Sequence, residues 1–125
     1  MIDVRIVLAG GWAALMFTYL LGDVLRIFAG DFTPGEMDGR PASQSMWMAA
    51  AVIMLIPILM ILLSLMLSHP AIRWVNIAAA IALMVFNLAG LPYPSPYDNF
   101  LIVVGLLLNG LIVWKAWGWV SDTVA

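Results

Sequence analysis

The sequence has no cysteine and only one histidine, His69. Without cysteine the chain cannot form disulfides, thiolate metal sites, iron–sulfur clusters or thiol redox centres. A single histidine also cannot supply the several imidazoles of a multi-histidine metal site or a bis-histidine haem site within one chain. We therefore expect neither a metal site nor a bound cofactor.

Charged residues are scarce, and the basic ones are scattered. Five Lys and Arg residues stand against seven Asp and Glu residues, which leaves a net charge of −2. Nucleic-acid backbones and anionic lipid headgroups are bound by clustered basic side chains, and no two basic residues here are adjacent. The sequence thus predicts no nucleic-acid partner and no polybasic attachment to anionic lipid.

Apolar residues dominate instead. They make up 65% of the 125 residues, charged residues only 10%, and the mean hydropathy is +1.07. A typical water-soluble domain is about half apolar and about a quarter charged, and one of this size lacks the interior volume to hide so many large apolar side chains. The composition predicts that membrane lipid surrounds most of the chain, and it excludes a cytosolic enzyme or an ordinary secreted domain.

Four apolar segments are each long enough, at about 20 residues, to cross ~30 Å of hydrocarbon as a helix. We expect Gly30 to end the first helix, and Ser95, Pro96 and Asp98 resemble a capping box at the start of the fourth. Short links make successive helices antiparallel neighbours. The predicted fold is all-α and integral to the membrane, an antiparallel four-transmembrane-helix bundle in one domain over residues 1–125. Its spans are 6–29, 46–67, 71–90 and 97–119, and its outer loop is 30–45.

The orientation of the bundle is predicted from its basic residues. Four spans place both termini on one side, together with Arg5, Arg73 and Lys115, whereas Arg26 and Arg40 lie on the other side. Because the side richer in Lys and Arg stays in the cytoplasm, we expect a multi-pass protein of the inner cell membrane with both termini cytoplasmic. A margin of three basic residues to two also leaves dual orientation open.

The first span carries an acid and a base near its end. Asp23 and Arg26 lie three residues apart, so they share a helix face, which continues back to Tyr19. One interpretation is an ion pair that reaches the interface and anchors the helix end. The other is a substrate-binding carboxylate held in place by its arginine.

The third and fourth spans carry polar side chains at helical spacing. Asn76 and Asn87 share one face of the third helix, and Asp98 and Asn109 share one face of the fourth. Lipid cannot hydrogen-bond an amide, so both faces are expected to point into the bundle. Asn76, Asn109 and Ser64 are interpreted as residues that hold helices together. The residues expected nearer the outer loop are assigned to a small binding pocket: Tyr19, Asp23, Arg26, Asn87 and Asp98.

Proline and several short motifs complete the pattern. Pro57 lies in the middle of the second span, where it removes a backbone hydrogen bond and is expected to kink the helix. The chain resembles an uncharacterised family of small prokaryotic four-span membrane proteins, and the resemblance implies topology but no activity. The segments that carry it are Thr18–Arg26, Pro34–Met37, Leu55–Met60, Asn87–Pro92 and Tyr97–Asp98.

Three functions remain open from the sequence. The first is binding or transport of a small lipophilic or cationic solute in the outer pocket. The second is a structural or accessory membrane subunit without a ligand of its own. The third is a small membrane enzyme that uses Asp23 as an acid or base, although Arg26 beside it would oppose the raised pKa that this role requires. The expected partners are membrane lipid, the solute, and either further copies of the chain or the other subunits of a membrane complex.

Overall fold

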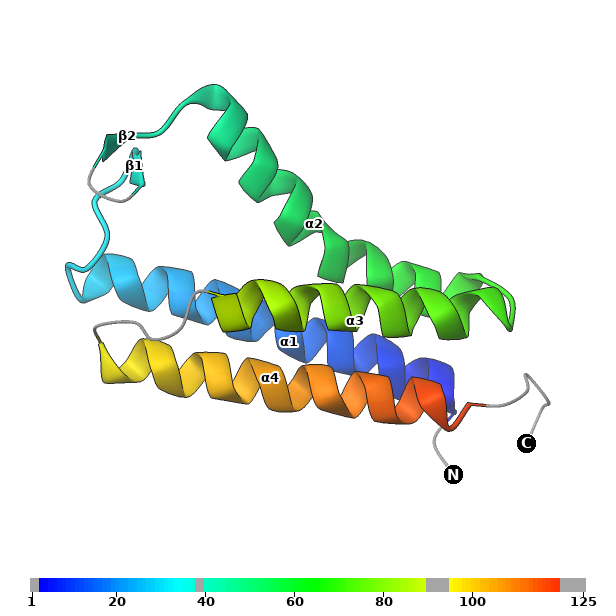
Figure 1. The fold of residues 1–125 in the computed structure, drawn as a ribbon. Coiled ribbons are helices and arrows are strands. Elements are labelled where there is room, and N and C mark those ends of the chain that lie inside the picture. Colours follow the sequence, from blue (N-terminus) through cyan, green and yellow to red (C-terminus); the bar gives the residue numbers. More distant parts are fainter. Residues whose placement is uncertain (1–2, 38–39, 90–94, 120–125) are drawn as a thin grey trace.

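The computed structural model describes residues 3–37, 40–89 and 95–119 (Figure 1). This part of the chain forms four helices, each long and apolar enough to cross a membrane. They pack against each other as an all-α bundle, which confirms the predicted fold class. The observed bounds are α1 (Val4–Phe28), α2 (Gln44–Met66), α3 (Ala71–Ala89) and α4 (Pro96–Trp117), and the predicted end of the third span at Gly90 lies outside the described residues.

The ends of the helices follow local rules, with one exception. Asp3 caps α1 by accepting a hydrogen bond from the backbone N–H of Arg5, and Gly30 follows the helix with a φ of 78°, as predicted for a stop residue. The capping box predicted at α4 is wrong, because Ser95 makes no capping hydrogen bond with its side chain. The hydroxyl of Ser95 instead donates to Asp31, and Asp98 pairs with Arg26.

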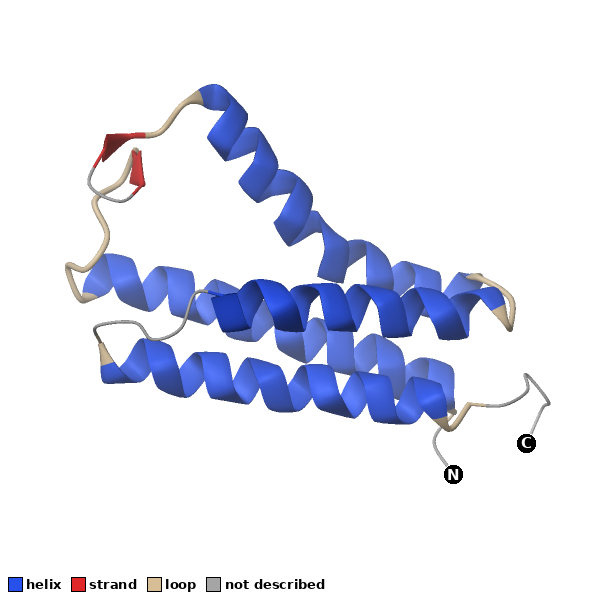
Figure 2. Cartoon of the chain, in the orientation of Figure 1, coloured by secondary structure: helices blue, strands red, loops and turns tan. Residues whose placement is uncertain are grey.

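The loop between α1 and α2 contains a short hairpin that was not predicted. Strand β1 (Glu36–Met37) pairs antiparallel with β2 (Arg40–Pro41), just after Gly35, whose φ of 88° is strained for other residue types (Figure 2). Two residues per strand are too few to show an alternating pattern in a sequence. The hairpin marks one end of the molecule, called here the loop end. The opposite end, where α1 begins and α4 ends, is called the terminal end (Figure 1).

The helices form a ring with one weak contact. Helix α1 packs against α2 and α4, and α3 packs against α4, whereas α2 and α3 contact each other least. Figure 1 shows the first half of α2 leaning away from the other helices, and its buried residues, Pro57, Met60 and Ser64, all lie in the second half. Pro57 lies inside the helix at this change, in agreement with the predicted kink. The short link therefore makes α2 and α3 neighbours mainly near the terminal end.

Asn76 joins three helices inside the packed half of the bundle. Its Oδ1 accepts hydrogen bonds from Trp12 Nε1 at 2.7 Å and from Ser64 Oγ at 3.3 Å, and its Nδ2 donates to the carbonyl of Ile72 at 2.9 Å. Asn76, Trp12 and Ser64 are all fully buried. In hydrocarbon these groups cannot form hydrogen bonds with water. Their hydrogen bonds to one another therefore favour one arrangement of α1, α2 and α3.

Basic side chains bind the carboxyl ends of helices at the terminal end. Arg5 donates to the carbonyl of Leu67, beyond the end of α2, at 2.6 Å. Arg73 donates to the carbonyls of Ala116 and Trp117 at the end of α4, at 3.2 and 2.8 Å. Carbonyls at a helix C-terminus lack the regular intrahelical partner and carry partial negative charge, so these contacts stabilise both helix ends.

Candidate binding site

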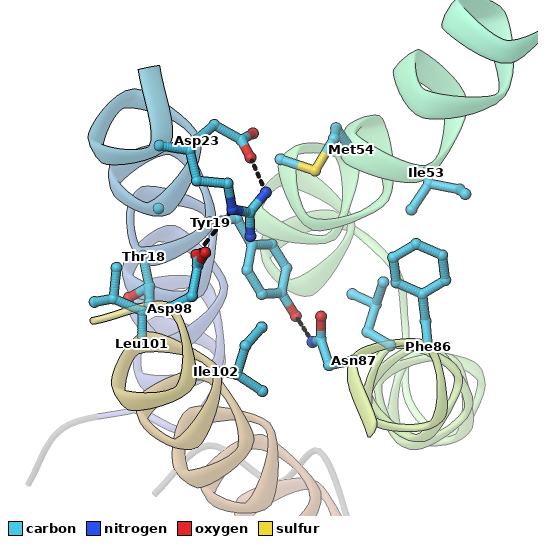
Figure 3. Close-up of a pocket in the computed structure, with 13 residues that line it drawn as sticks. Thr18, Tyr19, Asp23, Ile53, Met54, Phe86, Asn87, Asp98, Leu101 and Ile102 are labelled. Carbon is cyan, nitrogen blue, oxygen red and sulfur yellow. Dashed lines mark hydrogen bonds and ion pairs between the residues drawn. The ribbon is translucent and has the colours of Figure 1, made fainter. Parts of the chain in front are cut away.

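A pocket of about 240 Å³ lies in the loop-end half of the bundle, between side chains of all four helices (Figure 3). Its polar lining includes all five residues that the sequence analysis assigned to a pocket. Helix α1 supplies three of them, and α3 and α4 supply one each. They are Tyr19, Asp23, Arg26, Asn87 and Asp98.

Arg26 pairs with two carboxylates. Its Nε lies 2.8 Å from Asp98 Oδ1, and its Nη1 lies 3.2 Å from Asp23 Oδ1. The side chain of Asp98 is only 6% exposed, whereas that of Asp23 is 53% exposed. The pair of Asp23 with Arg26 follows from their spacing along one helix, but Asp98 lies 72 residues away in the chain. With all three groups ionised, the cluster carries one net negative charge.

Tyr19 is held by two amides. Asn87 Nδ2 donates to the Tyr19 hydroxyl at 2.6 Å, and Asn109 Nδ2 donates to it at 3.4 Å. The phenol ring lies close to Gly105 of α4, where an added Cβ would be in ordinary van der Waals contact with Tyr19 Cε1 at 3.5 Å. Asn109, predicted to hold helices together, is fully buried behind Tyr19 and does not line the pocket. Its Oδ1 has no hydrogen-bond partner among the described residues.

One wall of the pocket is apolar and comes largely from α2 and α3. Ile53 and Met54 of α2 face Leu83 and Phe86 of α3. Figure 3 shows Ile53 and Phe86 on the opposite side of Tyr19 from Asp98. The sequence analysis missed these residues because apolar side chains are common throughout the spans. Only the divergence of α2 from the bundle distinguishes them from side chains that simply face lipid.

The outer loop is tied to the start of α4 beside the pocket. Asp31 Oδ2 accepts hydrogen bonds from Ser95 Oγ at 2.7 Å and from Tyr97 Oη at 2.6 Å. These two donors lower the pKa of the Asp31 carboxyl below its usual value, because they stabilise the ionised form. At neutral pH the contact therefore joins an ionised carboxylate to two hydroxyls and connects α1 to α4 outside the helices.

The pocket combines ionised, hydrogen-bonding and apolar groups. Among the described residues no group of three His, Asp or Glu side chains is placed to hold a metal ion. Asp23, the candidate acid or base, is half exposed and lies 3.2 Å from Arg26 Nη1. The pocket therefore presents a carboxylate, an amide-bound phenol and an apolar wall to its interior.

No protein-family model matches this chain, and no curated protein or solved structure matches it either. The resemblance to small prokaryotic four-span membrane proteins therefore stays a prediction. The function has to be argued from the pocket itself.

Proposed function

We propose that this small four-span membrane protein binds a small lipophilic or cationic solute in the loop-end pocket. The observation that carries the proposal is the convergence of Tyr19, Asp23, Arg26, Asn87 and Asp98 on one cavity. Charged and polar groups in a membrane bundle are costly and mark functional sites by default. Binding is the common step of a receptor, a carrier or a solute-regulated subunit, and the pocket supports that step directly.

The contrast with Asn76 supports a binding role. The Asn76 cluster is closed on itself: its partners Trp12 and Ser64 are fully buried, and none of the three residues lines the loop-end pocket. The loop-end cluster also joins helices, through Arg26 and Asp98, but it leaves an open volume and a half-exposed carboxylate. Of these two polar clusters, it is the loop-end one that borders the pocket. We also propose that the chain works as a homo-oligomer or as a subunit of a larger membrane complex, since four helices alone enclose little space for a transport path.

Native mass spectrometry of the protein released from nanodiscs tests the proposal. We expect a discrete small-molecule mass on the wild-type protein that disappears in Asp23→Asn. Glu36→Gln is the matched control, because it also removes one acid from the loop end but lies outside the pocket lining. The same spectra report the oligomeric state.

A different result would favour the accessory-subunit alternative. If wild type and Asp23→Asn both carry only bulk lipid, and binding assays with added solutes show no dependence on Asp23, the pocket has no ligand of its own. Crosslinking for partner subunits would then be the next experiment.

A further inference from the structure

We propose that the ligand is a single-chain amphiphile with a cationic head, and that it occupies the pocket from the side, with its tail passing between α2 and α3 into the bilayer. This inference rests on the proposed binding function and names its substrate class. Three features of the described residues carry it: the charge of the polar wall, the position of the apolar wall, and the size of the cavity.

The charge of the polar wall selects a cation. Arg26 already pairs with both Asp23 and Asp98, so an anionic head would approach a cluster whose net charge is negative. Asp98 is buried and holds Arg26 at the shorter distance, which leaves Asp23 as the carboxylate that a guest can approach. An ammonium head beside Asp23 would neutralise the net negative charge of the cluster, and the partial burial of Asp23 makes that attraction stronger than it would be in bulk water.

The apolar wall lies at the opening of the ring. Helix α2 has no charged residue along its whole length, and the pocket residues that it supplies are Ile53 and Met54. Across from them, Phe86 of α3 is 57% exposed on the lipid side while it also lines the pocket. Helices α2 and α3 contact each other least of the neighbouring pairs, and most of the pocket residues that they supply are apolar. An alkyl chain matches such residues, whereas a polar solute would lose its hydration in passing between them.

The cavity is too small to enclose an amphiphile completely. Its volume of about 240 Å³ is below the ~300–1,000 Å³ of pockets that enclose drug-sized ligands. A head group and the first carbons of a chain fill it, so a longer chain has to leave through the side. The tail then lies in the hydrocarbon of the bilayer, where it is not exposed to water.

Photoreactive amphiphiles in nanodiscs of zwitterionic lipid test this inference. Three probes share one alkyl chain with a diazirine near its head and differ only in the head, which is an ammonium, a hydroxyl or a carboxylate. We expect saturable labelling by the ammonium probe at Ile53, Met54 or Phe86, at about ten times the level of the carboxylate probe. A difference of ~1.4 kcal/mol in binding corresponds to this factor.

Two variants separate the head site from the side opening. Asp23→Asn should weaken the apparent affinity for the ammonium probe about tenfold, and Glu36→Gln should leave it unchanged. Met54→Trp narrows the opening without touching a charged group, and it should reduce labelling at Phe86. Equal labelling by all three heads, or labelling confined to lipid-facing residues such as Leu107 of α4, would overturn the inference. A hydrophilic or anionic ligand that depends on Asp23 would also overturn it and would leave the proposed binding function standing.

Discussion

Arg26 lies between two carboxylates that differ greatly in their access to solvent. Asp98 is almost fully buried and closer to the guanidinium, and Asp23 is half exposed and farther away. A buried charge depends on its partner far more than an exposed one does, because water cannot replace the partner. We therefore expect Asp98 mainly to stabilise the fold. Asp23 is the carboxylate that remains accessible to a ligand.

This division predicts unequal stability costs for two chemically identical substitutions. Asp98→Asn should lower the free energy of unfolding by about 1.5–3 kcal/mol, since it removes a charged hydrogen bond of a nearly buried side chain. Asp23→Asn should cost less than about 1 kcal/mol, as expected for a half-exposed pair. Denaturation with SDS in mixed micelles, followed by circular dichroism, measures both. Equal costs would show that the two carboxylates share the structural role.

Asn76 is expected to stabilise the fold through its hydrogen bond with Trp12. Asn76→Ala leaves the buried indole N–H of Trp12 without its acceptor, so it should destabilise the fold by about 1–2 kcal/mol. Ser64→Ala should cost less, because the hydrogen bond of Ser64 is longer. In a Trp12→Phe background the cost of Asn76→Ala should fall, and a double-mutant cycle measures this coupling. Strict additivity of the two substitutions would mean that the hydrogen bond contributes nothing.

At the scale of elements, α2 differs from the other three helices. Its second half packs in the bundle and its first half leans away, with Pro57 between the two. Proline has no N–H for the carbonyl four residues earlier and its ring crowds that carbonyl, so the helix bends there. The first half of α2, which leans away, supplies Ile53 and Met54 to the pocket.

Pro57→Ala should therefore straighten α2 and bring its first half towards α3. Because the chain contains no cysteine, nitroxide labels can be attached at single introduced cysteines. With labels at Val52→Cys and Val85→Cys, two exposed positions, double electron–electron resonance measures the distance between α2 and α3. This distance should be shorter in Pro57→Ala than in the parent, by a few ångströms. Labels at Leu65→Cys and Ala78→Cys in the packed half serve as the control and should not move. An unchanged distance at the first pair would show that packing, not proline, sets the bend.

At the scale of the whole molecule, the four antiparallel helices place the start of α1 and the end of α4 together (Figure 1). Arg5, Arg73 and Lys115 lie towards that end and Arg26 and Arg40 towards the other, so we expect the terminal end in the cytoplasm. In intact cells a membrane-impermeant maleimide should label Glu36→Cys and leave Asp3→Cys unlabelled. The cysteine-free parent gives the background. Labelling of both variants to similar extents would indicate dual orientation.

The features that the sequence predicted correctly are those that depend on residues close together in the chain. Helix length, the shared faces of Asn76 with Asn87 and of Asp98 with Asn109, and the pairing of Asp23 with Arg26 all follow from hydropathy and a 3.6-residue period. The contact of Arg26 with Asp98 joins α1 to α4 and depends on how those helices pack, which no single periodicity encodes. For the same reason the sequence predicted a kink at Pro57 but not the opening beside it.

The arginines at the terminal end have a consequence for how the protein enters the membrane. Arg73 is one of the basic residues from which the orientation is predicted, and its guanidinium also spans the last two carbonyls of α4. Lysine carries the same charge on a single nitrogen and cannot reproduce that two-pronged contact. Arg73→Lys should therefore keep the direction of insertion, measured by maleimide labelling, while faster amide hydrogen exchange shows the end of α4 fraying. One substitution at position 73 would then weaken the folded end of α4 and leave the direction of membrane insertion unchanged.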